Sequence, residues 1–407
     1  MVIPEPRPCR EVIILAANTI ALLIPYGPAF SREFVVDLGA WEQPAENSVP
    51  ALVHGIKFSD GVEFDIRMDG DGELVVYHDE FVPGEGGIAE RCIESLSTSE
   101  LKSKGVVTFD ELLSNSNFTD AWGSTGKTVD IEIKIPHPVT KIDTDQYLES
   151  VFDLINEGVG PLDLPDKTTI VSSFSPRIST VAKSSSFEIP VTRLMPRIRS
   201  WGRYWRIKRI VAMPHFAMTS VPTMASSFRE EGMESIGMAL DYIVGWTRFV
   251  GPGKTVGIRG KGLRRLHKSL RGMGIFVWPA PLGIEDDLID AGVSLVSDNM
   301  NPDLFVKPDG SVRWPRPASQ PLDDEWRDAF TSSDVDEYGD LIREASSSLP
   351  EWNELSSERK SEIVVQRGRR SFWQGSEEKW KSESELGLPW GCPRIIGHRG
   401  SGKTHGG

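Results

Sequence analysis

The sequence predicts an α/β fold of the TIM (β/α)8 barrel type, followed by a C-terminal extension that is mostly helical or irregular. Two observations lead to this fold class. From Phe34 onward, short apolar runs alternate with amphipathic stretches, which is the pattern of βα units around a parallel sheet. About eight such strands fall within ~270 residues, and this number and span suit a closed barrel better than an open sheet.

The clearest predicted strands are FVVDL at 34–38, VEFDI at 62–66, ELVVYH at 73–78 and VDIEIKI at 129–135. Later candidates are TTIVSSF at 168–174, IPVTRLM at 189–195, SIGMAL at 235–240, GIFVWPA at 274–280 and VSLVSD at 293–298. Segments between them, such as ENSVPALVHGI and LRRLHKSLRGMG, carry apolar residues at helical spacing. We therefore expect the barrel to span residues 33–306.

The length and charge of the chain limit what it can contain besides the barrel and which partners it can bind. The chain has 407 residues, 39% of them hydrophobic, which is enough for one large domain plus additions. Residues 307–392 are acidic and contain several tryptophans, and we expect a linker or loosely packed helices there. The net charge of −14 argues against a general nucleic-acid or anionic-membrane binder, because both activities need a basic surface.

Residues 1–32 allow two interpretations. Arg7 and Arg10 precede the apolar run VIILAANTIALLI at 12–24, which resembles a secretory signal. At about 13 residues the run is short for a membrane span. A helix or strand that caps the barrel is an equal alternative, so the sequence leaves the location open between cytoplasmic and secreted.

The stretch at 61–80, GVEFDIRMDGDGELVVYHDE, carries the first candidate site residues. Glu63 and Asp65 lie two positions apart on one predicted strand, so their carboxylates share a face and can bind one cation. His78, at the end of the next predicted strand, can transfer protons beside that cation. These residues predict a metal-assisted hydrolase.

The predicted strand at 129–135 carries a second polar pair. Glu132 and Lys134 alternate with three isoleucines and therefore share a face. At the carboxyl end of a barrel strand they are candidates for a third metal ligand and a phosphate contact. An exposed edge strand would alternate in the same way.

Taken together, the motifs resemble the glycerophosphodiester phosphodiesterase family. PAENSVPA at 44–51 resembles its first helix start, VEFD at 62–65 its metal pair, VVYHDE at 75–80 its histidine strand and DIEIK at 130–134 its third ligand. SSFSP at 172–176, FVWPA at 276–280 and VSDNMNPDL at 296–304 resemble its later strands. The resemblance covers about residues 33–306.

The resemblance implies a specific reaction. Members are TIM barrels that hydrolyse glycerophosphodiesters to glycerol 3-phosphate and an alcohol with a divalent cation. Glu63, Asp65 and Glu132 would bind Mg²⁺ or Ca²⁺, His78 would be catalytic, and Lys134 and Trp278 would contact substrate. The expected partner is a small glycerophosphodiester or lysophospholipid-like molecule and no nucleic acid, with membrane contact only through the basic, aromatic segment RIRSWGRYWRIKR at 197–209.

The sequence departs from the family at the first motif. Asp37, Leu38 and Gly39 stand where the family has the triplet HRG, so a histidine and an arginine are missing there. Losing one member of an acid–base pair commonly lowers the rate by ~10²–10⁴. Full activity is therefore doubtful on the sequence alone.

The missing triplet occurs at the other end of the chain. The last residues read PRIIGHRGSGKTHGG, with His398, Arg399 and Gly400 after a short apolar strand. Residues 393–407 could be the opening strand of a truncated second barrel, a permuted strand of the same barrel, or a strand that completes another chain. The sequence favours truncation, because FVVDL already supplies a first strand. Only if the terminal strand completes the site would His398 be catalytic and Arg399 bind phosphate.

Two further functions remain open. The chain could be a degenerate barrel that binds ligands or a partner without turnover. It could also be a phospholipase D-like enzyme of the same barrel group, acting on choline-headed lipids.

Overall fold

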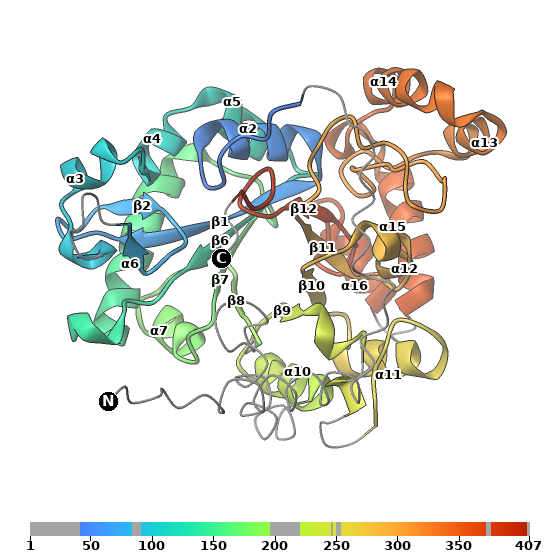
Figure 1. Ribbon diagram of the computed structural model, residues 1–407. Coiled ribbons are helices and arrows are strands. Elements are labelled where there is room, and N and C mark those ends of the chain that lie inside the picture. Colours follow the sequence, from blue (N-terminus) through green and yellow to red (C-terminus); the bar gives the residue numbers. More distant parts are fainter. Residues whose placement is uncertain are drawn as a thin grey trace, which may run out of the picture.

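The computed structural model describes residues 41–83, 91–195, 220–245, 247–249, 254–371 and 376–404. Within them, eight parallel strands form the barrel in the order β8-β7-β6-β1-β12-β11-β10-β9 (Figure 1). A parallel bridge between Leu194 and Gly237 closes the circle, and Met195 N donates to Gly237 O at 2.8 Å. The predicted fold class is confirmed.

The barrel strands are β1 Gly61–Met68, β6 Thr128–Ile133, β7 Thr169–Ser173, β8 Val191–Arg193, β9 Ser235–Ala239, β10 Gly274–Trp278, β11 Ser294–Ser297 and β12 Ile395–Gly397. The helices before the extension are α2 Val49–Phe58, α3 Thr98–Ser103, α4 Phe109–Leu113, α5 Ser116–Trp122, α6 Thr144–Val159, α7 Ile178–Ser184, α10 Val221–Glu230, α11 Gly260–Leu270 and α12 Glu285–Asp290.

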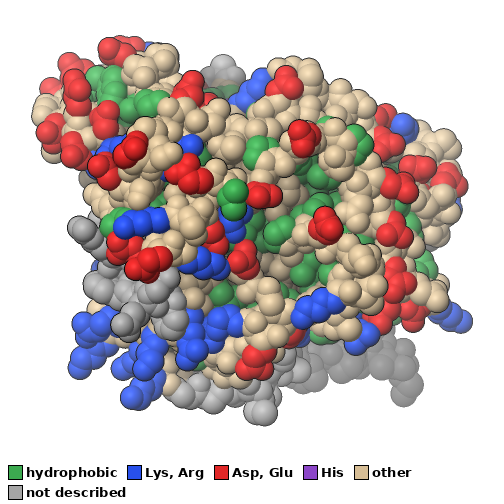
Figure 2. Space-filling model, turned by 180° about the vertical axis from the view of Figure 1, so that it is seen from behind, with side chains coloured by type: hydrophobic (Ala, Val, Ile, Leu, Met, Phe, Trp, Pro, Cys, Tyr) green, Lys and Arg blue, Asp and Glu red, His purple; other side chains and the backbone are tan. Residues whose placement is uncertain are grey.

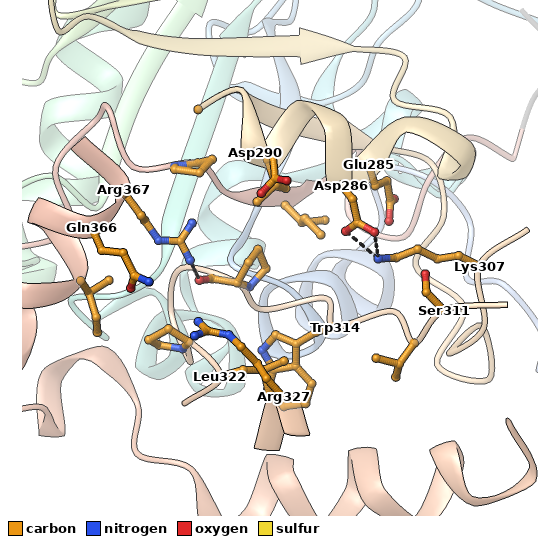
Figure 3. Close-up of a pocket in the computed structure, with 18 of the residues that line it drawn as sticks. Glu285, Asp286, Asp290, Lys307, Ser311, Trp314, Leu322, Arg327, Gln366 and Arg367 are labelled. Carbon is orange, nitrogen blue, oxygen red and sulfur yellow. Dashed lines mark hydrogen bonds and ion pairs between the residues drawn. The ribbon is translucent and has the colours of Figure 1, made fainter. Parts of the chain in front are cut away.

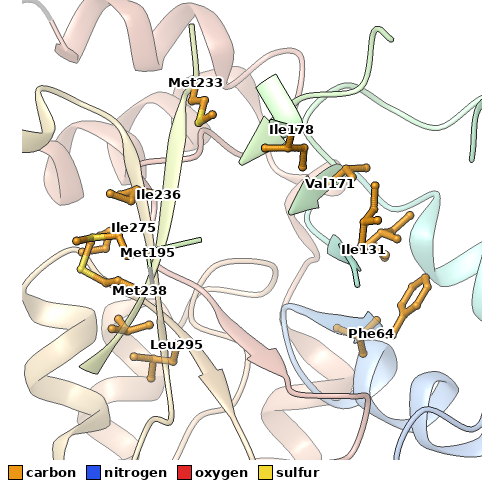
Figure 4. Packing of buried hydrophobic residues seen from close by; sticks show 14 of the residues in the cluster. Phe64, Ile131, Val171, Ile178, Met195, Met233, Ile236, Met238, Ile275 and Leu295 are labelled. Carbon is orange, nitrogen blue, oxygen red and sulfur yellow. The ribbon is translucent and has the colours of Figure 1, made fainter. Parts of the chain in front are cut away.

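Strand side chains alternate between two environments, as the period of two requires. One set is aliphatic or aromatic and packs against the surrounding helices (Figure 4); examples are Phe64, Ile131, Val171, Ile236 and Leu295. The other set points into the barrel and has an apolar layer of Ile170, Phe276, Val296 and Ile396. Beyond that layer, toward the carboxyl ends of the strands, the interior becomes polar.

The C-terminal strand belongs to this barrel. β12 lies between β1 and β11 and pairs in parallel with both, with Val62 opposite Gly397 and Leu295 opposite Ile395. This position corresponds to the permuted arrangement and differs from the truncation that the sequence favoured. The predicted first strand at 34–38, including Asp37, lies outside the described residues, as do residues 1–32 and the segment at 197–209.

One predicted strand has a different place. Residues 73–78 were expected in the barrel, but β2, Leu74–Val76, runs antiparallel to the end of β1 and pairs with β5, Val107–Thr108. The turn DGDG at 69–72 returns the chain immediately, and a parallel strand would need a longer crossover. β2 therefore forms a hairpin with the end of β1 on the rim of the barrel. β12 occupies a barrel position for which the sequence had predicted other strands. A short hairpin of β3 Phe81–Val82 and β4 Arg91–Cys92 follows.

The extension is helical, as predicted, but it is not loosely packed. It contains α13 Asp324–Ser332, α14 Tyr338–Ser348, α15 Ser357–Ser371 and α16 Ser376–Glu383. Trp352 and Trp380 are buried in one of its apolar clusters, and Trp314 and Phe330 in another. Its last segment sends Trp390 into the apolar layer of the barrel, against Phe276 with ring centroids 6.4 Å apart. Within the described residues, no helix has the length and apolar character needed to cross a membrane.

A buried carboxylate joins the extension and β12 to the barrel. Asp60, just before β1, accepts from Ala318 N at 3.1 Å and Ser319 N at 2.6 Å through Oδ1. Its Oδ2 accepts from Ile395 N at 2.9 Å. The side chain is fully buried, so these bonds replace all of its contacts with water.

We expect Asp60→Ala to lower the free energy of unfolding by about 3 kcal/mol, because three buried amides lose their acceptor. The amide of Ile395 should also exchange with solvent faster than the amides of β6. Urea unfolding and hydrogen exchange measure the two effects. The exposed Asp120→Ala is the control and should change stability by less than about 0.5 kcal/mol. Unchanged protection of Ile395 in Asp60→Ala would contradict the role given to this carboxylate.

Candidate metal and phosphate site

Three predicted metal ligands meet inside the barrel at the carboxyl end of β1 and β6. The strands are paired with Asp65 opposite Glu132, so the alternation that puts Glu63 and Asp65 on one face also brings Glu132 beside them. One carboxylate oxygen from each residue lies within 4.8 Å of the other two. Glu63 is 4% and Asp65 1% exposed.

Three carboxylates in a buried space repel each other, and the pKa of Glu63 shows it. Burial and then the charges of Asp65 and Glu132 raise the pKa of Glu63 well above its usual value. Burial would also raise the pKa of Asp65, but Lys134, His78 and Arg399 hold it well below the usual value. Glu63 Oε1 is buried without a hydrogen-bond partner. An unpartnered carboxylate oxygen in a set of oxygen donors fits a hard divalent cation such as Mg²⁺ or Ca²⁺.

Lys134 follows β6 directly and lies among these acids. Its Nζ is 2.8 Å from Asp65 Oδ1 and also contacts Glu132 Oε1. Burial would lower the pKa of Lys134, but Asp65 and Glu132 raise it above the usual value. The ammonium is therefore charged and offsets part of the negative charge of the cluster.

The N-terminal end of α2 holds Asp65 in place. Asn47 donates from Nδ2 to Asp65 Oδ2 at 2.9 Å, and its Oδ1 accepts from Asp65 N at 3.2 Å. This pair of bonds requires Asn47 to adopt a left-handed backbone with φ 56°, a conformation that asparagine tolerates better than most residues. Ser48 then caps the helix by accepting from Ala51 N. Sequence reasoning used this segment only as a helix start and missed the role of Asn47.

β12 brings His398 to the same place. His398 Nε2 is 3.8 Å from Glu63 Oε2, and Nδ1 is 2.7 Å from Asp298 Oδ1 at the end of β11. Burial lowers the pKa of His398. Burial alone would raise the pKa of Asp298, but the histidine lowers it to about 2. The charged Asp298 favours the tautomer that carries its proton on Nδ1, which leaves Nε2 facing the carboxylates.

Arg399 crosses the cluster next to His398. Its backbone N donates to Glu63 Oε2 at 3.0 Å, Nη1 donates to Glu46 Oε1 at 2.6 Å, and Nε lies 3.3 Å from Asp65 Oδ2. The residue has a left-handed backbone with φ 50°, which is uncommon outside glycine and occurs often at functional sites. The guanidinium brings a second positive charge to the three acids.

Two glycines let the loop after β12 reach this position. Gly400 has φ 89°, and a Cβ there would lie 2.5 Å from the backbone C of Ala51 on α2. Gly402 has φ 99°, and a Cβ there would lie 2.1 Å from Asp298 O. At both positions the positive φ angle and the nearby backbone atoms exclude any residue that has a Cβ. The loop consequently packs against both α2 and the Asp298 that contacts His398.

His78 lies at the rim, after β2. Its Nδ1 is 2.7 Å from Asp79 Oδ1 and its side chain is 30% exposed. Arg67 fixes the backbone by donating to His78 O at 3.3 and 3.2 Å, and Glu94 in turn binds Arg67 at 3.0 Å. His78 is close enough to Asp65 to lower the pKa of the Asp65 carboxyl. Two histidines therefore lie beside the acids: His78 faces solvent, and His398 is buried.

Trp278 ends β10, which is four strands away from β6 in the barrel order. Its ring meets Phe174, just after β7, edge to face at a centroid distance of 5.9 Å. Phe174 is 38% exposed. The two rings make an apolar wall at the carboxyl end of the barrel.

A separate cleft of about 490 Å³ lies between α12 and the extension (Figure 3). Asp286 and Lys307 form an ion pair of 2.6 Å on one side, and Trp314, Arg327 and Arg367 line other parts. It contains none of the predicted site residues.

The structure therefore brings together Glu63, Asp65, Glu132, Lys134, His398 and Arg399, with His78 at the rim and Trp278 on the opposite wall. The sequence did not single out Glu46, Asn47 and Asp298 as partners of these residues. Their polar character at a helix start and a strand end is the only local signal for them.

Comparisons with known proteins found one family model and several similar solved structures. Residues 38–226 match the model of the glycerophosphoryl diester phosphodiesterase family. No curated protein sequence matches the chain. Similar solved structures include a glycerophosphodiester phosphodiesterase from Parabacteroides distasonis, with 19% identity, TM-score 0.43 and coverage of 63% of this chain and 87% of that one.

Two other similar structures have comparable scores. A glycerophosphodiester phosphodiesterase from Thermotoga maritima has 20% identity, TM-score 0.37 and coverage of 63% and 89%. An Oleispira antarctica phosphodiesterase in complex with sn-glycerol-3-phosphate has 14% identity, TM-score 0.41 and coverage of 64% and 92%. The match of residues 38–226 to the family model confirms the resemblance that the motifs predict.

Proposed function

We propose that the protein hydrolyses glycerophosphodiesters to glycerol 3-phosphate and an alcohol. The observation that carries the proposal is the position of His398, whose Nε2 lies 3.8 Å from the carboxylate of Glu63 although the sequence lacks the expected histidine near residue 37. The barrel thereby has two histidines, His78 and His398, beside one group of acids. The replacement of the first HRG by Asp37, Leu38 and Gly39 does not then remove the acid–base pair.

Glu63, Asp65 and Glu132 would hold a divalent cation, Mg²⁺ or Ca²⁺. The orphaned Glu63 Oε1 supports this assignment, as does the burial of the acids, since buried carboxylates are costly without a counter-charge. When bound, such a cation supplies positive charge that stabilises the phosphoryl oxygens. Asn47 orients Asp65, and the backbone N of Arg399 orients Glu63.

The two histidines would divide the proton transfers. His398, held neutral by burial and oriented by Asp298, would accept at Nε2 the proton of the attacking group, which is the glycerol hydroxyl when the alcohol leaves and then the water that opens the resulting cyclic phosphate to glycerol 3-phosphate. His78, which is exposed to solvent at the rim, would donate a proton to the leaving alcohol and exchange it with water. If His78 were the base and His398 the acid, the same two imidazole rings would transfer the protons.

Substrate binding would use both walls of the barrel. Lys134 and Arg399 would contact the phosphate, since both bring positive charge to the acids. Trp278 and Phe174 would contact the alcohol. A phospholipase D-like reaction on a choline-headed lipid and a degenerate barrel without turnover are the alternatives that the following experiments separate.

We expect His78→Ala and His398→Ala each to lower kcat for glycerophosphocholine by about 10²–10⁴ in the presence of Mg²⁺, because each removes half of an acid–base pair. Release of glycerol 3-phosphate and choline is the measurement. His137→Ala, a histidine on the loop after β6, is the control and should retain activity. No turnover by the wild type would overturn the hydrolase proposal, and turnover of only lysophosphatidylcholine would favour the phospholipase D-like alternative.

Asp298→Asn should lower kcat by about 10²–10³ and leave KM nearly unchanged. The amide no longer fixes the histidine proton on Nδ1, whereas Asp298 contacts no residue assigned to the phosphate. Steady-state kinetics separate kcat from KM. An equal rise in KM would instead indicate that the loop carrying Arg399 has moved.

Cation binding has a readout that is independent of turnover. At a concentration about 100 times its Kd, Mg²⁺ or Ca²⁺ should raise the free energy of unfolding by about 2.7 kcal/mol. Glu63→Gln should abolish this increase, and the exposed Glu149→Gln on α6 should not. Equal stabilisation of both variants by the cation would remove Glu63 from the ligand set.

A further inference from the structure

The side chains at the carboxyl end of the barrel differ between its two halves. On β12, β1 and β6 they are the charged groups described above. On the next strands in the barrel order, Phe174 follows β7, Leu194 follows β8 and Trp278 ends β10. Two residues beyond the last paired positions of β6 and β7, the same register places Phe174 beside Lys134. The apolar half therefore begins next to the proposed phosphate contact.

A glycine on β9 allows two of these apolar side chains to meet. A Cβ at Gly237 would lie 2.3 Å from Leu194 Cδ2 and 3.3 Å from Trp278 Cζ3. A side chain at this position would therefore displace Leu194. Phe174 also contacts the indole of Trp278, and the planes of the two rings are nearly perpendicular, at 88°. We call Phe174, Leu194, Gly237 and Trp278 the apolar corner.

The apolar corner offers a ligand no charge and few hydrogen-bond partners. In the described part of the chain, no side chain that faces the interior from β8, β9 or β10 is charged. Arg193 of β8 points outward, where it lies 3.7 Å from Glu231 and over the ring of Phe228 on α10. The hydroxyls of Thr192 and Ser235, deeper in the barrel, hydrogen-bond to each other. A hydroxyl or N–H group of a ligand would lose water here without gaining a side-chain partner from these strands.

This environment discriminates between the possible arms of a glycerophosphodiester. A glycerol arm has two free hydroxyls, and each loses its hydrogen bonds to water if it enters the corner. A primary ammonium has three N–H donors and meets the same difficulty. A trimethylammonium group has no N–H or O–H to satisfy, and its positive charge is attracted to the faces of aromatic rings. The corner therefore fits an alcohol of the choline type.

The outer surface of the protein does not supply this discrimination. In Figure 2, acidic side chains gather over α13 and α14 at the upper left, and lysine and arginine side chains gather around α11 at the lower left. A diester of glycerol and choline carries one negative and one positive charge, so neither group of surface charges concentrates it. Selection of the alcohol then takes place inside the barrel.

We propose that the apolar corner is a subsite that selects phosphodiesters whose alcohol carries a quaternary ammonium group. The inference rests on the proposed hydrolysis and adds the chemical class of the alcohol that leaves. Phe174 and Trp278 contact the ammonium through their rings. Gly237 is a positioning residue, because it leaves room for Leu194 against the indole.

Binding can be measured without turnover in the His78→Ala variant. By calorimetry in the presence of Mg²⁺, glycerophosphocholine should bind at least about tenfold more tightly than glycerophosphoglycerol, both of whose arms carry hydroxyls. It should also bind about fivefold more tightly than its 3,3-dimethylbutyl analogue, which has the same shape and no positive charge. Equal affinity for the analogue would overturn recognition of the ammonium, and equal affinity for glycerophosphoglycerol would overturn the subsite.

Substitutions in the wild type locate the preference. Trp278→Leu and Phe174→Leu each remove a ring but keep apolar volume, and each should lower the ratio of kcat/KM for glycerophosphocholine to that for glycerophosphoglycerol about fivefold. Gly237→Ala should lower this ratio as well, because Leu194 or Trp278 must move. The matched control is Phe58→Leu, at the end of α2 that precedes β1, and it should leave the ratio unchanged.

The outcomes separate this proposal from the hydrolase proposal. An unchanged ratio in both Trp278→Leu and Phe174→Leu would contradict the subsite even if every variant is active. Absence of turnover of both diesters by the wild type, together with the binding preference in His78→Ala, would support the subsite and overturn hydrolysis.

Discussion

The structure depends on the insertion of β12 between β1 and β11. An eight-stranded barrel with one strand missing has two open edges, and their unpaired amides and carbonyls would point into the gap between β1 and β11. Ile395–Gly397 satisfy both edges. Asp60 fixes the start of the strand through Ile395 N and, through Ser319 N, ties it to the extension. The same strand that closes the barrel therefore determines where His398 and Arg399 lie.

The electrostatic arrangement of the site follows from this closure. Glu63, Asp65 and Glu132 are brought together by β1 and β6 alone, and they would form an uncompensated negative cluster in a low-dielectric interior. Lys134 supplies one positive charge from β6. Arg399 supplies another only because β12 is in place. Closure of the barrel and charge balance in its interior are consequently coupled.

Local patterns in the sequence were sufficient for the fold class and for most strands, because short apolar runs recur along the chain between amphipathic stretches and turn residues. They also placed Glu63 and Asp65 on one face, since spacing on one strand fixes which side chains share a face. They misplaced the strand at 73–78, which pairs antiparallel with β1 through the tight turn at 69–72. They failed for Asn47, and they placed Asp298 at a family-like position without its contact to His398, because contacts across the barrel have no local signature.

The sequence misjudged the C-terminal segment for a related reason. FVVDL at 34–38 and RIIG at 394–397 both have the composition of a strand. Propensity alone cannot decide which of the two occupies a given position in the barrel. The tertiary contacts of β12 with Asp60, of Trp390 with the apolar layer and of Gly402 with Asp298 distinguish the second segment, and each depends on residues far away in the chain.

The pairing of β12 also affects how the chain reaches its native state. Asp60 and Ile395 are 335 positions apart, and joining them costs about 5 kcal/mol of loop entropy in a chain that is otherwise unfolded. Prior folding of the extension shortens that effective loop and places Trp390 beneath the barrel. Because this contact spans so much of the chain, we expect the last strand to join the barrel late in folding.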